Sequence, residues 1–133
     1  MFYPRDLYPR LEKELETSQA TVITGMRRVG KTTALKYLYD LVASQNKAFF
    51  DFANPLHRQL FELQDYDSIL NNLQRDHGIN PHKRAYLFLD EIQNYPPITS
   101  VMKYLHDHYE TKFFVTGSSS YYLKNLFPES MAG

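Results

Sequence analysis

The sequence contains no cysteine, and its formal charges cancel, with 15 basic and 15 acidic side chains. Without cysteine, disulfide bonds and thiolate metal sites are excluded; this fits a reducing compartment, so we expect a cytoplasmic protein. A zero net charge argues against a dedicated nucleic-acid surface, although it is compatible with a local basic patch. No apolar run approaches about 18 residues, so we expect no membrane span, and the first residues do not resemble a secretory signal.

The composition that is present is that of a globular protein. The 133 residues are 43% hydrophobic and 23% charged, and the aromatic residues are 11 tyrosines and nine phenylalanines. A chain of this size can bury a core within one domain. Because no internal repeat, low-complexity tract or linker interrupts it, residues 1–133 are predicted to form a single domain.

Residues 25–32 read GMRRVGKT and satisfy the phosphate-binding loop pattern G-x-x-x-x-G-K-[ST]. Gly25 and Gly30 allow backbone turns that a Cβ would block, so that successive N–H groups can surround phosphate oxygens. Lys31 offers a positive charge to the β- and γ-phosphates, and the Thr32 hydroxyl can ligate Mg²⁺. The predicted nucleotide-binding segment consists of Gly25, Met26, Arg27, Arg28, Val29, Gly30, Lys31, Thr32 and Thr33.

The residues around this loop supply the strand and the helix that the motif needs. A β-branched run over 20–24 indicates a buried strand, and apolar residues from Thr32 onward recur at helical spacing. Further strands are predicted over 48–52, 85–90 and 112–116, and helices over 9–16, 56–63, 65–77, 98–109 and 121–127. Because strands alternate with helices, we predict an α/β fold, the P-loop NTPase three-layer sandwich with a mainly parallel sheet.

A second nucleotide-associated pattern ends the strand predicted over 85–90. Asp90 at the carboxyl end of a buried parallel strand would lie at the sheet edge where ligands bind, and could hold Mg²⁺ directly or through water. Glu91 is then placed to take a proton from the water that attacks the γ-phosphate. Alone, such a run also fits a strand entering an acidic turn; the phosphate loop upstream favours the functional interpretation.

A third element, Thr-Gly-Ser-Ser, begins at Thr116 and follows the last predicted strand. A hydroxyl here could contact the γ-phosphate or the attacking water, with Ser118 as the first choice and Thr116 as the second. The alternative is a serine-rich turn, since glycine and serine are common at strand ends. Arg27 and Arg28 are open to three interpretations: contact with a phosphate, with a neighbouring subunit, or with solvent.

Three segments, VITGMRRVGKTT, LFLDEIQ and FVTGSSS, resemble the prokaryotic AAA-like ATPases of the AAA_14 type, over Thr21 to Ser120. The resemblance implies a P-loop ATPase core with an additional catalytic glutamate, which matches Glu91. It also implies that Gln93 lies near the γ-phosphate.

The sequence departs from the family pattern after the serine-rich turn. Members usually continue into Leu-Ala-Gly-Arg, a fifth strand and a separate C-terminal domain, whereas this sequence ends at Gly133. The resemblance therefore implies an N-terminal fragment with four strands and a missing fifth strand, arginine and C-terminal domain. The strand over 21–24 would then be an exposed apolar edge, for which we expect self-association or exchange of an element with a second chain, unless a helix covers that edge.

The leading prediction is an ATPase module that uses ATP and Mg²⁺, with Glu91, Lys31 and Ser118 as catalytic residues and Thr32 and Asp90 as metal ligands. The alternative is a nucleotide-dependent switch with little turnover of its own, because transition-state charge often needs an arginine in cis or trans. A small-molecule kinase is disfavoured by the lack of an arginine-rich lid segment, and a GTPase by the lack of Asn-Lys-x-Asp. The process that hydrolysis would drive is left open.

Overall fold

The computed structural model describes residues 7–24, 28–63, 65–117 and 131–132. Within these residues the chain forms a five-stranded sheet with strand order β2-β3-β4-β1-β5, in which all neighbouring strands are parallel. The strands are β1 (Thr21–Ile23), β2 (Lys47–Asp51), β3 (Ala85–Asp90), β4 (Thr111–Thr116) and β5 (Met131–Ala132).

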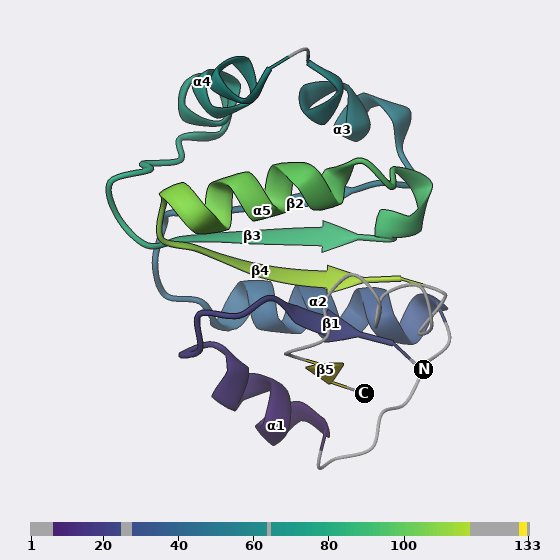
Figure 1. Cartoon of the computed structure of the whole chain (residues 1–133). Coiled ribbons are helices and arrows are strands. Elements are labelled where there is room, and N and C mark those ends of the chain that lie inside the picture. Colours follow the sequence, from purple (N-terminus) through teal and green to yellow (C-terminus); the bar gives the residue numbers. More distant parts are fainter. Residues whose placement is uncertain (1–6, 25–27, 64, 118–130, 133) are drawn as a thin grey trace.

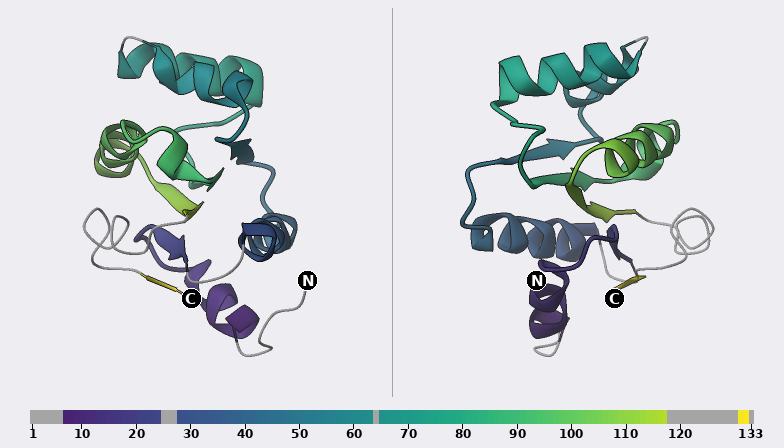
Figure 2. Two further views of the ribbon diagram at one scale, coloured as in Figure 1. Left: turned by 90° about the vertical axis from the view of Figure 1, so that its right-hand side faces the viewer. Right: turned by 60° about the vertical axis from the view of Figure 1, so that its left-hand side comes forward.

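Helices lie on both faces of this sheet. They are α1 (Leu7–Glu14), α2 (Arg28–Leu41), α3 (Pro55–Gln59), α4 (Tyr66–His77) and α5 (Ile98–His108), with short 3₁₀ turns η1 (Leu60–Glu62) and η2 (Ile92–Asn94). Figures 1 and 2 show α2 on one face of the sheet and α5 on the other. The predicted three-layer α/β sandwich is therefore confirmed. None of the helices in the described ranges combines the length and apolar character needed to cross a membrane.

The two central strands read as apolar runs because both of their faces are buried. In β3, Leu87 and Leu89 belong to the core on the α5 side, whereas Phe88 belongs to the core beneath α2. Phe88 stacks on Phe114 of β4 with ring centroids 5.0 Å apart. Successive side chains of a strand point to opposite faces of the sheet, and here the side chains on both faces are apolar.

The predicted elements agree with the structure, apart from boundaries that differ by a few residues. The helix over 65–77 begins and ends as its capping residues indicate: Asp65 accepts a hydrogen bond from the Ser68 N–H, and Gly78 adopts the left-handed conformation at φ 68°. The helix after the phosphate loop begins at Arg28, four residues before the predicted start. The helix predicted over 121–127 lies outside the described residues.

The prediction that the fifth strand is missing is wrong. The two-residue strand β5 pairs in parallel with β1, aligning Val22 with Met131 and Ile23 with Ala132. β1 therefore has a neighbour on each side, β4 and β5. Even a two-residue strand can pair with backbone N–H and C=O groups of β1 that would otherwise lack a strand partner. The basis for self-association through a bare β1 edge is removed at these residues.

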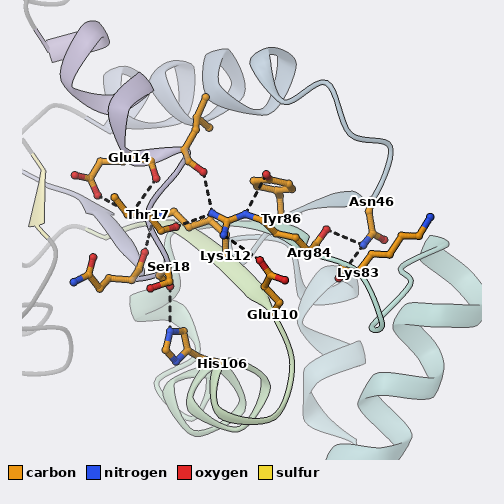
Figure 3. Close-up of polar contacts among 12 residues, drawn as sticks. Glu14, Thr17, Ser18, Asn46, Lys83, Arg84, Tyr86, His106, Glu110 and Lys112 are labelled. Carbon is orange, nitrogen blue, oxygen red and sulfur yellow. Dashed lines mark hydrogen bonds and ion pairs between the residues drawn. The ribbon is translucent and has the colours of Figure 1, made fainter.

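At the amino-terminal ends of the strands, two basic side chains hold the connection between α1 and β1 (Figure 3). The Arg84 guanidinium donates hydrogen bonds to the carbonyls of Leu15 at 2.9 Å and Thr17 at 2.7 Å. The Lys112 ammonium donates to the hydroxyls of Thr17 and Thr21 and to the carbonyl of Gln19. We call Arg84, Lys112 and these acceptors the amino-edge cluster.

Lys112 is only 1% exposed. Burial lowers the pKa of its ammonium to about 8, against the opposing attraction of Glu14, while the Arg84 charge lowers it further. The cluster thus fastens the chain just before β1, at the opposite end of the sheet from the phosphate-loop pattern.

Candidate nucleotide-binding site

The three sequence motifs meet at one edge of the sheet. Strands β1, β3 and β4 are neighbours and run in the same direction, so their carboxyl ends lie side by side. Helix α2 begins at this same edge, shortly after β1 ends (Figure 1). A helix amino terminus beside the carboxyl ends of parallel strands is the usual position for phosphate binding.

A pair of threonine hydroxyls holds the Asp90 carboxylate from two sides. Thr32 in the first turns of α2 donates to Asp90 Oδ2 at 2.8 Å, and Thr116 at the end of β4 donates to Asp90 Oδ1. The first contact joins the phosphate loop to the acidic strand end across 58 residues of sequence. The structure therefore brings Thr32 and Asp90, the two predicted metal ligands, into direct contact.

Asp90 is 3% exposed, and its burial raises the pKa of the carboxyl. The hydrogen bonds from Thr116 and Thr32 oppose this shift, whereas the charges of Glu91 and Asp51 add to it. Asp51 ends β2 and pairs in register with Asp90. Asp51 is not among the predicted site residues, although the strand predicted over 48–52 carries the same signal, an acidic residue near the end of an apolar run.

Glu91 is buried and has a backbone conformation that is rare for a side-chain-bearing residue, with φ 60° and ψ 53°. Its N–H donates to the Thr116 hydroxyl at 2.8 Å. The Gln93 side-chain amide donates to Glu91 Oε1 at 2.6 Å. The turn that Glu91 and η2 make after β3 thus folds the chain back, so that Gln93 contacts the carboxylate two residues before it.

Lys31 crosses from α2 to the end of β4. Its ammonium donates to the carbonyl of Gly117 at 2.7 Å, and the residue is 3% exposed. Gly117 contributes only a backbone oxygen, which no side-chain pattern reveals, and the sequence analysis did not single it out. Gly30 is buried in the first turn of α2, whereas Thr33 lies exposed on the same helix.

Part of the predicted site lies outside the described residues. This holds for Gly25, Met26 and Arg27 of the loop and for Ser118, the first choice for contact with the γ-phosphate. Arg28 and Val29 belong to the first turn of α2, but only their backbone is described. Thr116, the second choice, contacts the two acidic residues at the end of β3.

Comparison with known proteins identifies the family and the fold of the chain. The model of the family AAA_14, described as "AAA domain", matches residues 17–133. No curated protein matches the sequence. Among solved structures, PCH-2 of C. elegans matches with a TM-score of 0.54 and 12% sequence identity, over 96% of this chain and 39% of the PCH-2 chain.

The likeness to PCH-2 supports the fold alone at this level of identity, and the present chain spans well under half of that protein's length. The family match carries more weight, because it includes the phosphate loop, the acidic end of β3 and the end of β4. The chain belongs to the AAA_14 family of AAA domains and has the fold of a nucleotide-binding P-loop ATPase module.

Proposed function

We propose that this domain binds ATP together with Mg²⁺ and hydrolyses the γ-phosphate bond. The observation that carries the proposal is the 2.8 Å hydrogen bond between Thr32 Oγ1 and Asp90 Oδ2. It joins the hydroxyl expected to ligate a nucleotide-bound metal to the carboxylate expected to organise that metal. The contact thus supports the functional interpretation of both motifs.

The donor atoms at this point suit Mg²⁺, which prefers hard oxygen ligands in octahedral geometry. At metal–oxygen distances of 2.0–2.1 Å, neighbouring ligands of an octahedron lie about 2.9 Å apart. The Thr32 and Asp90 oxygens are separated by 2.8 Å and so could occupy adjacent positions, directly or through a water. The metal would supply charge neutralisation at the phosphates.

The remaining roles in this proposal rest on the sequence pattern together with the described contacts. Lys31, held beside the end of β4 by Gly117, carries three N–H hydrogens and can add contacts to the β- and γ-phosphate oxygens. The N–H groups of residues 25–33 and the positive end of α2 would surround the same phosphates. Glu91 takes the proton of the attacking water, and Ser118 contacts the γ-phosphate.

Two variants test these assignments. Lys31→Ala should abolish ATP binding, measured by isothermal titration calorimetry, whereas Lys36→Ala on the exposed face of the same helix should not change it. Glu91→Gln should bind ATP normally and lose multiple-turnover hydrolysis. If Glu91→Gln releases phosphate at the wild-type rate, the assignment of the base is wrong.

A second function, a nucleotide-dependent switch with little turnover, is favoured by one contact. The 2.6 Å hydrogen bond from the Gln93 amide occupies a lone pair of Oε1, one of the two carboxylate oxygens that the attacking water would have to approach. Turnover would then need a partner, such as an arginine from a second copy of the chain. Nucleotide that co-purifies and outlasts dialysis, with less than one turnover per chain, would support the switch over the ATPase.

A further inference from the structure

Thr116 lies between the two acidic residues at the end of β3, and the roles proposed above give it no function. It is the last residue of β4 and is fully buried, at 0% exposure. Its hydroxyl donates to Asp90 Oδ1 and accepts the N–H of Glu91 at 2.8 Å. One oxygen atom of β4 thus contacts both acidic residues at the end of β3.

The hydrogen-bonding capacity of a hydroxyl limits what else Thr116 can do. A threonine hydroxyl has one hydrogen and two lone pairs. Because Asp90 takes the single hydrogen, Thr116 has none to donate to a γ-phosphate oxygen while this contact exists. In this geometry the hydroxyl cannot be a donor to a γ-phosphate oxygen, whereas the other predicted contact, with the attacking water, stays a prediction.

The contact with Glu91 has a different consequence. Glu91 lies in the left-handed region at φ 60°, where a side-chain-bearing residue is disfavoured by roughly 1–2 kcal/mol. The hydrogen bond to Thr116 offsets part of that cost and fixes the direction in which the Glu91 side chain leaves the backbone. At the same time Thr32 and Thr116 hold the two oxygens of Asp90 in a single orientation.

We propose that Thr116 is a positioning residue that holds Asp90 and Glu91 in one fixed arrangement, so that metal ligand and base act on the same nucleotide. The inference rests on the proposed ATPase function and deepens it. In this role Thr116 acts through Asp90, the last residue of β3, and through Glu91, which follows it.

The test compares Thr116→Val, which keeps the shape and removes the hydroxyl, with Thr116→Ser, which keeps the hydroxyl. At saturating Mg²⁺, we expect Thr116→Val to lower kcat at least about tenfold and to leave KM for ATP within about twofold. Thr116→Ser should stay within about threefold of wild type in both constants. A wild-type kcat in Thr116→Val, or a failure of serine to rescue a folded protein, would overturn the proposal.

A second measurement does not depend on hydrolysis. In a titration of Mg²⁺ into protein and a fluorescent ATP analogue, the half-saturating Mg²⁺ concentration should rise at least about fivefold in Thr116→Val and stay unchanged in Thr116→Ser. If the valine variant does not fold, Thr116→Ala, which leaves room for a water, is measured in its place. An unchanged Mg²⁺ midpoint in the folded hydroxyl-free variant would contradict the proposal.

The two measurements distinguish a failure of the proposed ATPase function from a failure of the proposed role of Thr116. A wild-type protein that binds the analogue in a Mg²⁺-dependent manner but releases no phosphate would overturn hydrolysis as the function, while the Mg²⁺ midpoints still decide for or against Thr116. A wild-type protein that binds no nucleotide would overturn both proposals.

Discussion

The two ends of the central strands both carry buried polar side chains, but they use them in different ways. At the amino ends, Arg84 and Lys112 direct their hydrogens to carbonyls and hydroxyls of the connection before β1. At the carboxyl ends, two neutral hydroxyls hold the buried carboxylate of Asp90, and the residue after it has a disfavoured backbone conformation.

Burial shifts the pKa of both charged groups toward the neutral form, and the difference lies in how many of their hydrogen-bonding positions the chain itself fills. The Lys112 ammonium has three hydrogens and three oxygen acceptors, which matches its full hydrogen-bonding capacity. Burial raises the pKa of Asp90 despite its two hydrogen bonds, so the folded protein holds this carboxylate at a cost. A cation bound beside Asp90 would offset that cost. Because the chain already accepts all three Lys112 hydrogens, whereas Asp90 could still gain a cation, we expect the amino ends to fasten the chain and the carboxyl ends to bind a ligand.

The largest expected effect comes from the carboxyl ends. Asp90→Asn should lower ATP turnover at least about hundredfold, because a neutral amide binds Mg²⁺ poorly. The melting temperature should stay equal or rise, since a buried charge is removed. Asp76→Asn on the exposed surface of α4 is the matched control and should change neither quantity. A large drop in the melting temperature of Asp90→Asn would break the comparison.

The next effect belongs to the amino ends. Arg84→Met should lower the free energy of unfolding by about 2 kcal/mol, because the carbonyls of Leu15 and Thr17 lose a charged donor. ATP affinity at 25 °C should remain within about twofold of wild type. Both free energies are measured by urea titration. The control Arg75→Met, at a side chain 70% exposed, should change the free energy of unfolding by less than about 0.5 kcal/mol. Equal destabilisation by both variants would count against a fastening role for Arg84.

A pH-dependent effect sharpens the role of Lys112. The pKa of Lys112 is about 8 in the folded protein, whereas its ordinary value of 10.5 applies to the unfolded chain. Between these two pH values the unfolded chain therefore binds a proton that the folded protein does not. The contribution of Lys112 to the free energy of unfolding therefore rises with pH across this window. Stability of wild type minus that of Lys112→Met should increase between about pH 7.5 and 10, by more than about 1 kcal/mol. Subtracting the variant removes contributions of other groups, such as Tyr95, whose raised pKa acts in the opposite sense.

The smallest expected effect concerns Gln93. Gln93→Ala removes the amide that contacts Glu91 Oε1, so the attacking water can approach this oxygen more easily and kcat should rise about threefold with little change in KM. Gln74→Ala on the exposed side of α4 is the control. A fall in kcat would instead mean that Gln93 helps to orient the base, and it would weaken the case for a nucleotide switch.

Much of the fold and the first half of the site could be predicted from local patterns. The strand over 85–90 has a near-continuous apolar run because both faces are buried, and the helix over 65–77 is marked by Asp65 and Gly78 at its ends. Lys31 and Thr32 belong to one short motif whose chemistry requires those residue types. The rule that parallel strands end at the same edge then brings Asp90 to them.

The contacts that complete the site followed from no such pattern. The partnership of Thr116 with Asp90 and Glu91 depends on the register between β3 and β4, which places Leu89 beside Val115. The contact between Gln93 and Glu91 depends on a left-handed residue that the sequence does not mark with glycine. The fifth strand has only two residues, too few for any periodicity to reveal.

By itself, therefore, the sequence determined the α/β order of the chain, the phosphate loop and the identity of the acidic pair, because each depends on residues that lie close together in the chain. Only the tertiary structure decided that Thr32 and Thr116 hold Asp90 between them, that Lys31 reaches Gly117, and that Arg84 and Lys112 fasten the other end. Those contacts join residues far apart in sequence. Their geometry is set by strand register and backbone conformation, which emerge when the whole sheet has formed.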